Sequence, residues 1–349
     1  MILFFLACEG PTEPDDTATV DPLSWAVDEA GPYAVGYRES SATYTLLGED
    51  RTIALGFWYP TEDTTGAEVR YTSGFPDTAA FQDASMAPPA WDGAYPVMVY
   101  SHGDRGYGAT SPFLARHFAS HGWVVVAPDH TGNTLMHSDD PRPTSIYVAR
   151  PNDVTVALDA LEGDPAFAAA DTSRVLLSGH SFGAFTTWSI AGARFDGAEA
   201  RCDAGAVPSG TCSDAERAAF AQGFRDTRVV ATAPMAGNLD RNWFGDEGES
   251  VVDVPVAFFG GTDDDVGQAD QFAEMSPSVE FTWVELEGAC HQAFALGGCL
   301  HLDSDVGFRI LNTWILAFAR AHVRDDDRHA ALLDGSEPVD PLVTVQTNW

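Results

Sequence analysis

A serine in a glycine-rich turn is the first feature of this sequence that could do chemistry. Gly179-His180-Ser181-Phe182-Gly183 follows an apolar run at 174–177 and leads into a helix-like run at 182–193. A serine on a sharp turn from strand to helix projects its hydroxyl outward, and the flanking glycines relieve crowding at that turn. The spacing predicts Ser181 as a nucleophile. A simple glycine-rich turn without chemistry is the alternative.

A serine hydroxyl is a weak nucleophile and needs a neighbouring base. His291 follows a predicted strand at 279–286 and is the expected base, with His301 as its nearest rival. His102 and His130 also follow predicted strands, but they precede the serine in the chain. The order of the chain therefore favours His291.

The base in turn needs an acid that holds its tautomer and stabilises the imidazolium ion. Three consecutive aspartates, Asp263, Asp264 and Asp265, follow a predicted strand at 254–259. A carboxylate here completes the order serine, aspartate, histidine that is typical of one hydrolase fold. Order alone leaves the choice among the three open, because any of them could instead cap a helix or face water.

Acyl transfer also needs two backbone N–H donors for the negative charge that develops on the carbonyl oxygen. The predicted donors are Phe182, just after the serine at a helix start, and Asp104, in the loop after a predicted strand at 97–100. Gly103 lets the backbone at Asp104 approach a substrate. The Asp104 side chain is expected to point away from the oxyanion.

The elements that must position these residues alternate between strands and helices. This pattern predicts an α/β fold with a mostly parallel central sheet and helices on both faces. Residues 60–95 are expected to be irregular surface. Strands are predicted at 52–59, 97–100, 123–127, 174–177, 228–233, 254–259 and 279–286, and helices at 112–120, 153–161, 182–193 and 306–323.

The chain is expected to form one large domain with extensions. The prediction divides it into a signal-like segment at 1–8, a flexible acidic tether at 9–30, the α/β domain at 31–324 and a tail at 325–349. Within the domain, residues 194–227 form a long connection that is either a lid over the site or a packed surface excursion.

Charge excludes several functions. Of the 349 residues, 52 are acidic and 18 are basic, for a net charge of −34, and every basic residue is an arginine. Without lysine there is no Schiff-base lysine, Ser–Lys dyad or P-loop lysine. A surface this acidic should repel nucleic acid, so no nucleic-acid partner is expected. We expect a monomer that needs no cofactor and no metal.

The cysteines indicate export. Cys202 and Cys212 are close in sequence, as are Cys290 and Cys299, and this even set predicts two disulfides and an oxidising compartment. Four free thiols are the alternative. The apolar residues before Cys8 resemble the end of a bacterial lipoprotein signal. They suggest a membrane tether through lipidated Cys8, or else a secreted protein.

Several short stretches together resemble a known family. The pattern resembles the α/β-hydrolase superfamily, in its dienelactone-hydrolase-like and platelet-activating-factor-acetylhydrolase-like serine esterase branch, to which bacterial cutinase-like polyester hydrolases are related. The resemblance covers about residues 31–323. The stretches are Gly31-Pro32-Tyr33-Ala34-Val35-Gly36, Tyr100-Ser101-His102-Gly103, Ala119-Ser120-His121-Gly122-Trp123-Val124-Val125-Val126, Pro128-Asp129-His130 and Gly179-His180-Ser181-Phe182-Gly183.

The resemblance implies the α/β-hydrolase fold and a triad of Ser181, Asp264 and His291. Asp264 is selected because Gly261-Thr262-Asp263-Asp264 matches a Gly-Thr-x-Asp run that many hydrolases of this fold carry at this place. The implied activity is hydrolysis of a small-molecule or lipid carboxylic ester through an acyl-enzyme. The alternatives are an acyltransferase or amidase with the same triad, and a catalytically silent surface lipoprotein.

Overall fold

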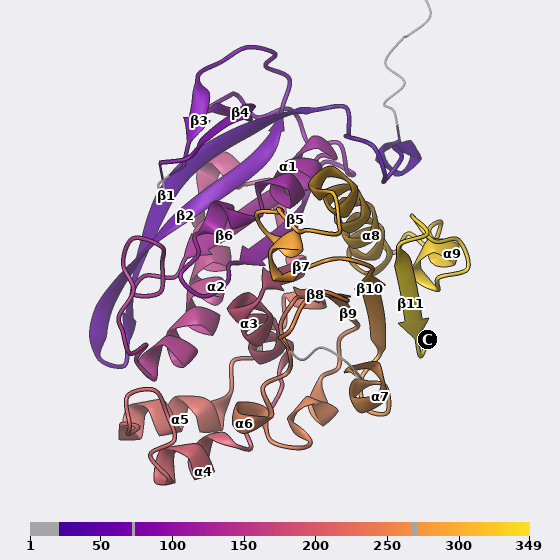
Figure 1. Cartoon of the computed structure of the whole chain (residues 1–349). Coiled ribbons are helices and arrows are strands. Elements are labelled where there is room, and N and C mark those ends of the chain that lie inside the picture. The colour runs from indigo at the N-terminus through magenta and orange to yellow at the C-terminus, as the bar shows by residue number, and fades with distance from the viewer. Residues whose placement is uncertain (1–20, 72–73, 267–270) are drawn as a thin grey trace, which may run out of the picture.

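The computed structural model of the chain describes residues 21–71, 74–266 and 271–349. Its described strands form one sheet of 11 strands in the order β11-β10-β9-β8-β7-β5-β6-β2-β1-β4-β3 (Figure 1). The strands are β1 (Ala34–Leu46), β2 (Glu49–Thr61), β3 (Glu68–Arg70), β4 (Pro76–Gln82), β5 (Tyr95–Ser101), β6 (Val124–Asp129), β7 (Ala170–His180), β8 (Val229–Met235), β9 (Val256–Gly261), β10 (Phe281–Leu286) and β11 (Val343–Thr347).

The middle of the sheet is parallel. Strands β6, β5, β7, β8, β9 and β10 pair in parallel, whereas β2 joins β6 and β11 joins β10 in antiparallel pairs. Parallel strands that are buried on both faces consist of near-continuous apolar runs, and β5 is buried along its whole length. The predicted mostly parallel α/β fold is confirmed.

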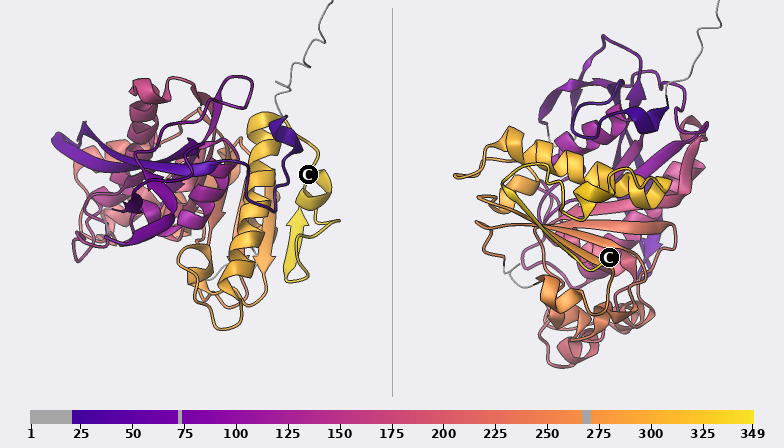
Figure 2. Two further views of the ribbon diagram at one scale, coloured as in Figure 1. Left: turned by 90° about the horizontal axis from the view of Figure 1, so that it is seen from above. Right: turned by 90° about the vertical axis from the view of Figure 1, so that its right-hand side faces the viewer.

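Helices cover both faces of this sheet. Side chains alternate along each strand, so Met98 of β5 packs in the core that includes α1 and α8, while Val97 and Val99 pack in the core that includes α2. Figure 2 shows α8 lying across one face. The helices are α1 (Pro112–Ser120), α2 (Ser145–Gly163), α3 (Phe182–Ala191), α4 (Ala198–Asp203), α5 (Asp214–Gln222), α6 (Arg241–Phe244), α7 (Gln271–Met275), α8 (Ser304–Arg324) and α9 (Ala330–Leu333).

Two regions that the sequence analysis left outside the regular fold belong to the sheet. Residues 60–95, predicted as irregular, contain β3 and β4, and the segment 325–349, predicted as a tail, contributes β11 to the sheet edge. Short strands at a sheet edge carry little periodic signal, because their pairing with a distant strand stabilises them more than their own composition.

The predicted tether also differs from the structure in its second half. Residues 1–20, including Cys8, lie outside the described residues, but from Asp21 the chain packs on the domain. The N-terminal strap (residues 22–33) is held through its backbone: the Val27 carbonyl accepts a hydrogen bond from His117 Nε2 at 3.0 Å. The carbonyls of Glu29 and Trp25 accept from His121 Nε2 at 2.9 Å and from Arg320 Nη1 at 2.8 Å.

These two histidines are neutral in the folded protein. Burial lowers the pKa of His117 to about 4 and, with the neighbouring His117, the pKa of His121 to about 3, against an ordinary value of 6.5. The unfolded chain therefore binds protons on both imidazoles as the pH falls below 6.5, while the folded protein does not. We expect stability to fall between about pH 7 and pH 5 by about 2 kcal/mol for each histidine.

Urea unfolding at the two pH values measures this loss. His117→Gln keeps an N–H donor for the Val27 carbonyl and removes one titrating group. Its free energy of unfolding should therefore depend less on pH than that of the wild type, by about 2 kcal/mol over the interval. An unchanged pH dependence in His117→Gln would contradict the assignment.

Candidate active site

The turn between β7 and α3 holds Ser181 in a strained conformation. Its φ is 56° and its ψ is −115°, in a region that non-glycine residues rarely adopt, at a cost of about 1–3 kcal/mol. The Ser181 N–H donates to the Met235 carbonyl at 2.8 Å, which fixes the turn. A Cβ atom at Gly183 would lie 2.0 Å from the Ser101 carbonyl oxygen, so only glycine allows this packing.

The three residues that the sequence analysis proposed as a triad meet in space. His291 Nε2 lies 2.9 Å from Ser181 Oγ, and His291 Nδ1 lies 3.0 Å from Asp264 Oδ2 and 3.2 Å from Oδ1. The Asp264 side chain is fully buried, whereas the imidazole is 27% exposed. An Nδ1–H that donates to the carboxylate leaves Nε2 free to accept the serine proton.

The rival residues have other partners. Asp263 Oδ2 is hydrogen-bonded to Nδ1 of His301, whose side chain is 63% exposed, and Asp265 is exposed. His102 and His130 are completely buried in a polar network away from the imidazole of the triad. His291 was selected by its position in the chain and Asp264 by the Gly-Thr-x-Asp match. These are the two residues that the structure places in line with Ser181.

His180 has a structural role that the sequence analysis missed. Its Nε2 donates to the His291 carbonyl at 2.9 Å, and the two rings lie 4.8 Å apart. Burial, followed by the proximity of His291, lowers the pKa of His180 to about 4, so His180 is neutral at physiological pH. The neighbour of the nucleophile thus anchors the loop that carries the base. Its position inside the glycine-rich motif was the available signal.

The predicted oxyanion donors lie on two adjacent segments. The loop after β5 passes against the nucleophile, since a Cβ atom at Gly103 would lie 3.2 Å from Ser181 Cβ. Across the described part of the chain, neither the Asp104 N–H nor the Phe182 N–H has a hydrogen-bond acceptor. The Asp104 carboxylate is held by Asn133 Nδ2 at 2.7 Å and by Arg142 Nη1 at 2.8 Å, which compensates its charge.

A cavity of about 930 Å³ opens in front of the serine. Its walls are mainly apolar. Besides the predicted site residues, they come from Tyr71 and residues 75–79 at the start of β4, from the segment after Asp104, and from the loop after His291. Phe75 stacks on Tyr107 with their ring centroids 6.0 Å apart. This volume is in the range of cavities that bind drug-sized molecules.

Of the two alternatives for residues 194–227, a lid and a packed excursion, the position of the cavity does not favour the lid. All of residues 194–227 are described, and none of them lines the cavity. The segment instead packs against α2 and α6, and its Ser209 Oγ lies 2.5 Å from Thr144 Oγ1. Figure 1 shows α4 and α5 together with α6 at the end of the molecule below α3. These contacts favour the packed excursion.

Both predicted disulfides form. Cys202 pairs with Cys212, and Cys290 pairs with Cys299, which is consistent with an oxidising compartment. None of the described helices is long and apolar enough to cross a bilayer. The described residues also contain no cluster of three or more histidine, cysteine, aspartate or glutamate side chains that could hold a metal ion.

Comparisons with known proteins point to esterases. A family model described as Chlorophyllase matches residues 71–201. Cutinase 2 of Thermobifida cellulosilytica is 24% identical over 262 residues, which cover 72% of this chain and 78% of that protein. A ferulic acid esterase from Streptomyces cinnamoneus superposes with a TM-score of 0.64 at 18% identity, covering 93% of this chain and 99% of the other.

The chain has the α/β-hydrolase fold, and it is related to esterases of that fold. The resemblance inferred from its motifs is thereby confirmed. These relationships support hydrolysis of a carboxylic ester as the activity.

The disulfide beside His291 should affect the site more than the other one. Cys290→Ser with Cys299→Ser should cost about 2–3 kcal/mol of stability by freeing a short loop, and should also slow the reaction of Ser181 with a fluorophosphonate probe. The reason is that this loop carries both His291 and cavity wall residues. Urea unfolding and the labelling rate measure the two effects.

The second disulfide provides the matched control. Cys202→Ser with Cys212→Ser frees a loop of similar length that does not line the cavity, so stability should fall comparably while labelling stays near the wild-type rate. Equal losses of labelling rate in the two double variants would show that the loop next to His291 has no special role.

Proposed function

We propose that the protein is a serine hydrolase that cleaves carboxylic esters through an acyl-enzyme intermediate. The observation that carries this proposal is the hydrogen-bond chain from Ser181 through His291 to Asp264 at the wall of the cavity. Such a chain lets an imidazole remove the hydroxyl proton while a carboxylate stabilises the resulting imidazolium ion. The mechanism needs no cofactor.

In the first half-reaction, Ser181 Oγ attacks the ester carbonyl carbon as His291 Nε2 takes its proton. The negative charge moves to the carbonyl oxygen, where the N–H groups of Phe182 and Asp104 are the proposed donors. Phe182 begins α3, so the helix dipole also favours negative charge at this point. The intermediate collapses, and the leaving alcohol receives the proton from His291.

In the second half-reaction, water replaces the alcohol. His291 removes a proton from water, the hydroxide attacks the acyl carbon, and the acid product leaves as Ser181 Oγ regains its proton. Asp264 remains ionised throughout and keeps the imidazole oriented. An alcohol or amine that entered in place of water would turn the same steps into acyl transfer.

Removal of the serine hydroxyl tests the proposed function. In hydrolysis of p-nitrophenyl butyrate, Ser181→Ala should lower kcat by about 10³-fold or more with the fold retained. Quenched wild-type reactions should also contain an acyl adduct on the peptide that includes Ser181, seen by mass spectrometry. Ser189→Ala, at a buried serine of α3 that does not line the cavity, is the control and should retain turnover. Equal turnover in Ser181→Ala and wild type would exclude the mechanism.

The cavity walls support bulky apolar esters as the preferred substrates. Phe75, Tyr107, Leu135 and Leu296 line the cavity, and Phe75 is 54% exposed although it is aromatic. A substrate that covers Phe75 would remove apolar surface from water, which is worth about 25 cal/mol per Å². The gain should increase with the size of the bound group until the wall is covered.

The wall can be tested by shortening one side chain. Phe75→Ala should lower kcat/KM for p-nitrophenyl octanoate by about 10-fold, with little effect on the acetate ester, because the short acyl chain cannot cover the lost surface. Leu300→Ala is the matched control, since Leu300 is 88% exposed and does not line the cavity. Equal effects of Phe75→Ala on both esters would argue against the proposed preference.

A further inference from the structure

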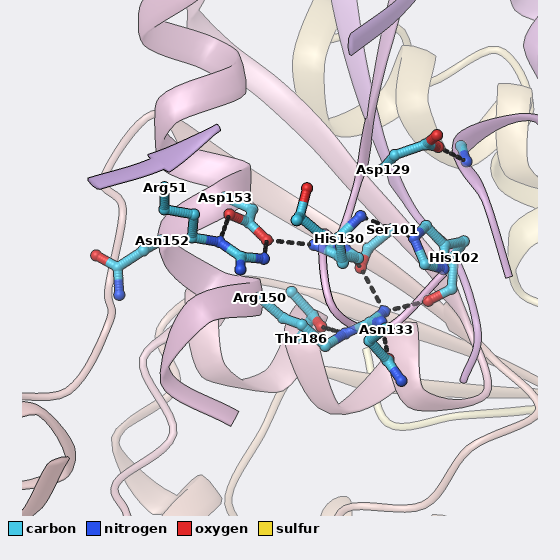
Figure 3. A network of polar contacts seen from close by, with 12 residues as sticks. Arg51, Ser101, His102, Asp129, His130, Asn133, Arg150, Asn152, Asp153 and Thr186 are labelled. Carbon is cyan, nitrogen blue, oxygen red and sulfur yellow. Dashed lines mark hydrogen bonds and ion pairs between the residues drawn. The ribbon is translucent and has the colours of Figure 1, made fainter. Parts of the chain in front are cut away.

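A buried arginine lies behind the proposed oxyanion hole. Arg150 of α2 is completely buried, and its guanidinium donates to neutral oxygens only, within the part of the chain that the structure describes (Figure 3). Burial lowers the pKa of Arg150 to about 9, so the group still carries its charge at neutral pH. Burying a cation without a direct ion pair lowers the stability of the fold, so a functional role for Arg150 is worth seeking.

The guanidinium holds the loop that carries one proposed donor. Arg150 Nη2 donates to the His102 carbonyl and, at 3.2 Å, to Ser101 Oγ. Asp104, whose N–H is the proposed donor, lies two residues after His102 in the chain. Because the guanidinium is planar and rigid, it fixes the position of the carbonyl that it binds more closely than a flexible side chain would.

Asn133 provides a second link between the arginine and this loop. Its Oδ1 accepts from Arg150 Nη1 at 2.8 Å, while its Nδ2 donates to Asp104 Oδ1 at 2.7 Å. The Asn133 side chain is almost entirely buried, so these bonds have little competition from water. The two ends of one amide thus connect the buried cation to the side chain of the donor residue.

The same guanidinium contacts the residue that carries the other donor. Its Cζ lies 4.5 Å from the centre of the Phe182 ring, and Arg142 lies over the same ring at 4.2 Å. Cation–π contacts of this kind favour one position of the ring. Arg150 therefore touches both segments that carry the proposed N–H donors, although those segments are far apart in the chain.

Buried histidines complete the support of the loop. Burial lowers the pKa of both His102 and His130 well below the usual value, so both are neutral. His130 Nδ1–H donates to Asp153 at 2.9 Å, which leaves Nε2 to accept from Ser101 Oγ at 2.9 Å. The His130 N–H donates to His102 Nε2 at 3.0 Å, which leaves His102 Nδ1–H to donate to the Gly103 carbonyl.

Ser101, His130 and Asp153 repeat the hydrogen-bond pattern of a catalytic triad, but all three are completely buried. Asp153 also accepts from Arg51 Nε at 2.8 Å and Nη2 at 2.7 Å, so its charge is compensated. A serine that no substrate can reach is no nucleophile. This second constellation serves as a rigid base for the loop after β5.

We propose that Arg150, together with Asn133, is a positioning residue. It holds the two N–H donors of the oxyanion hole at the positions that they need relative to Ser181 Oγ. The proposal rests on the serine hydrolase function proposed above. Its direct consequence is kinetic: loss of the link displaces donors that act chiefly in the transition state. Turnover should then fall while ground-state binding of the ester changes little.

The test compares two variants with a matched control. In p-nitrophenyl butyrate hydrolysis, Arg150→Met and Asn133→Ala should each lower kcat by about 10- to 100-fold, with KM within about twofold of wild type. Arg320→Met is the control, because Arg320 is equally buried but binds the Trp25 carbonyl and His121 on the opposite side of the sheet. It should lower the melting temperature and leave kcat within about twofold.

A transition-state mimic separates positioning from general destabilisation. A trifluoromethyl ketone adds to Ser181 and places a negative oxygen in the oxyanion hole. In Asn133→Ala its inhibition constant should therefore rise by about the same factor by which kcat/KM falls. Should Arg150→Met fail to fold, Asn133→Ala decides the question. A kcat within about twofold of wild type in Asn133→Ala, or an equal loss of kcat in Arg320→Met, would overturn the proposal. The Ser181→Ala variant separates this failure from a failure of the proposed function. If Ser181→Ala is inactive while Asn133→Ala is fully active, the positioning role is refuted and the serine hydrolase function stands.

Discussion

The whole site depends on close backbone packing around one turn. The turn at Ser181 is wedged between the end of β5 and the segment after β8: a Cβ atom at Gly183 would lie 2.0 Å from the Ser101 carbonyl oxygen, and one at Gly237 would lie 2.4 Å from the Ser181 carbonyl oxygen. These contacts hold a serine at positive φ, which the local sequence would not adopt by itself. The central parallel strands provide the rigidity that makes this possible.

The buried titratable groups around that turn are neutral histidines and carboxylates that are paired with donors. His180 is neutral and supports the backbone of His291, while His102 and His130 are neutral and support the loop after β5. In His102 and His130 one ring nitrogen donates and the other accepts, each with a defined partner, which is the condition for burying an imidazole without large cost. The polar groups beneath the site are therefore held by hydrogen bonds to one another and carry little net charge, although the chain as a whole is strongly acidic.

The sequence by itself determined the features that depend on neighbouring residues. Apolar strands and amphipathic helices alternate along the chain, and a helix over 112–120 was predicted with the bounds of α1. The glycine-flanked turn at Ser181 and the chain order of serine, aspartate and histidine are likewise local or ordinal properties. They were enough to predict the α/β fold, Ser181 and His291, whereas the choice of Asp264 among three consecutive aspartates also needed the resemblance to a known family. The close spacing of the cysteines in sequence predicted both disulfides.

Only the tertiary structure decided which distant residues meet. The hydrogen bond from Arg150 to the His102 carbonyl joins residues 48 positions apart, and no periodic pattern marks either partner. The cavity walls come in part from Tyr71, residues 75–79 and the loop after His291, while residues 194–227, for which a lid was one of two alternatives, pack elsewhere. The last strand, β11, joins the sheet through antiparallel pairing with β10, which lies far from it in the chain. Such contacts depend on how the layers pack, and a sequence pattern records the face that is buried but not its partner.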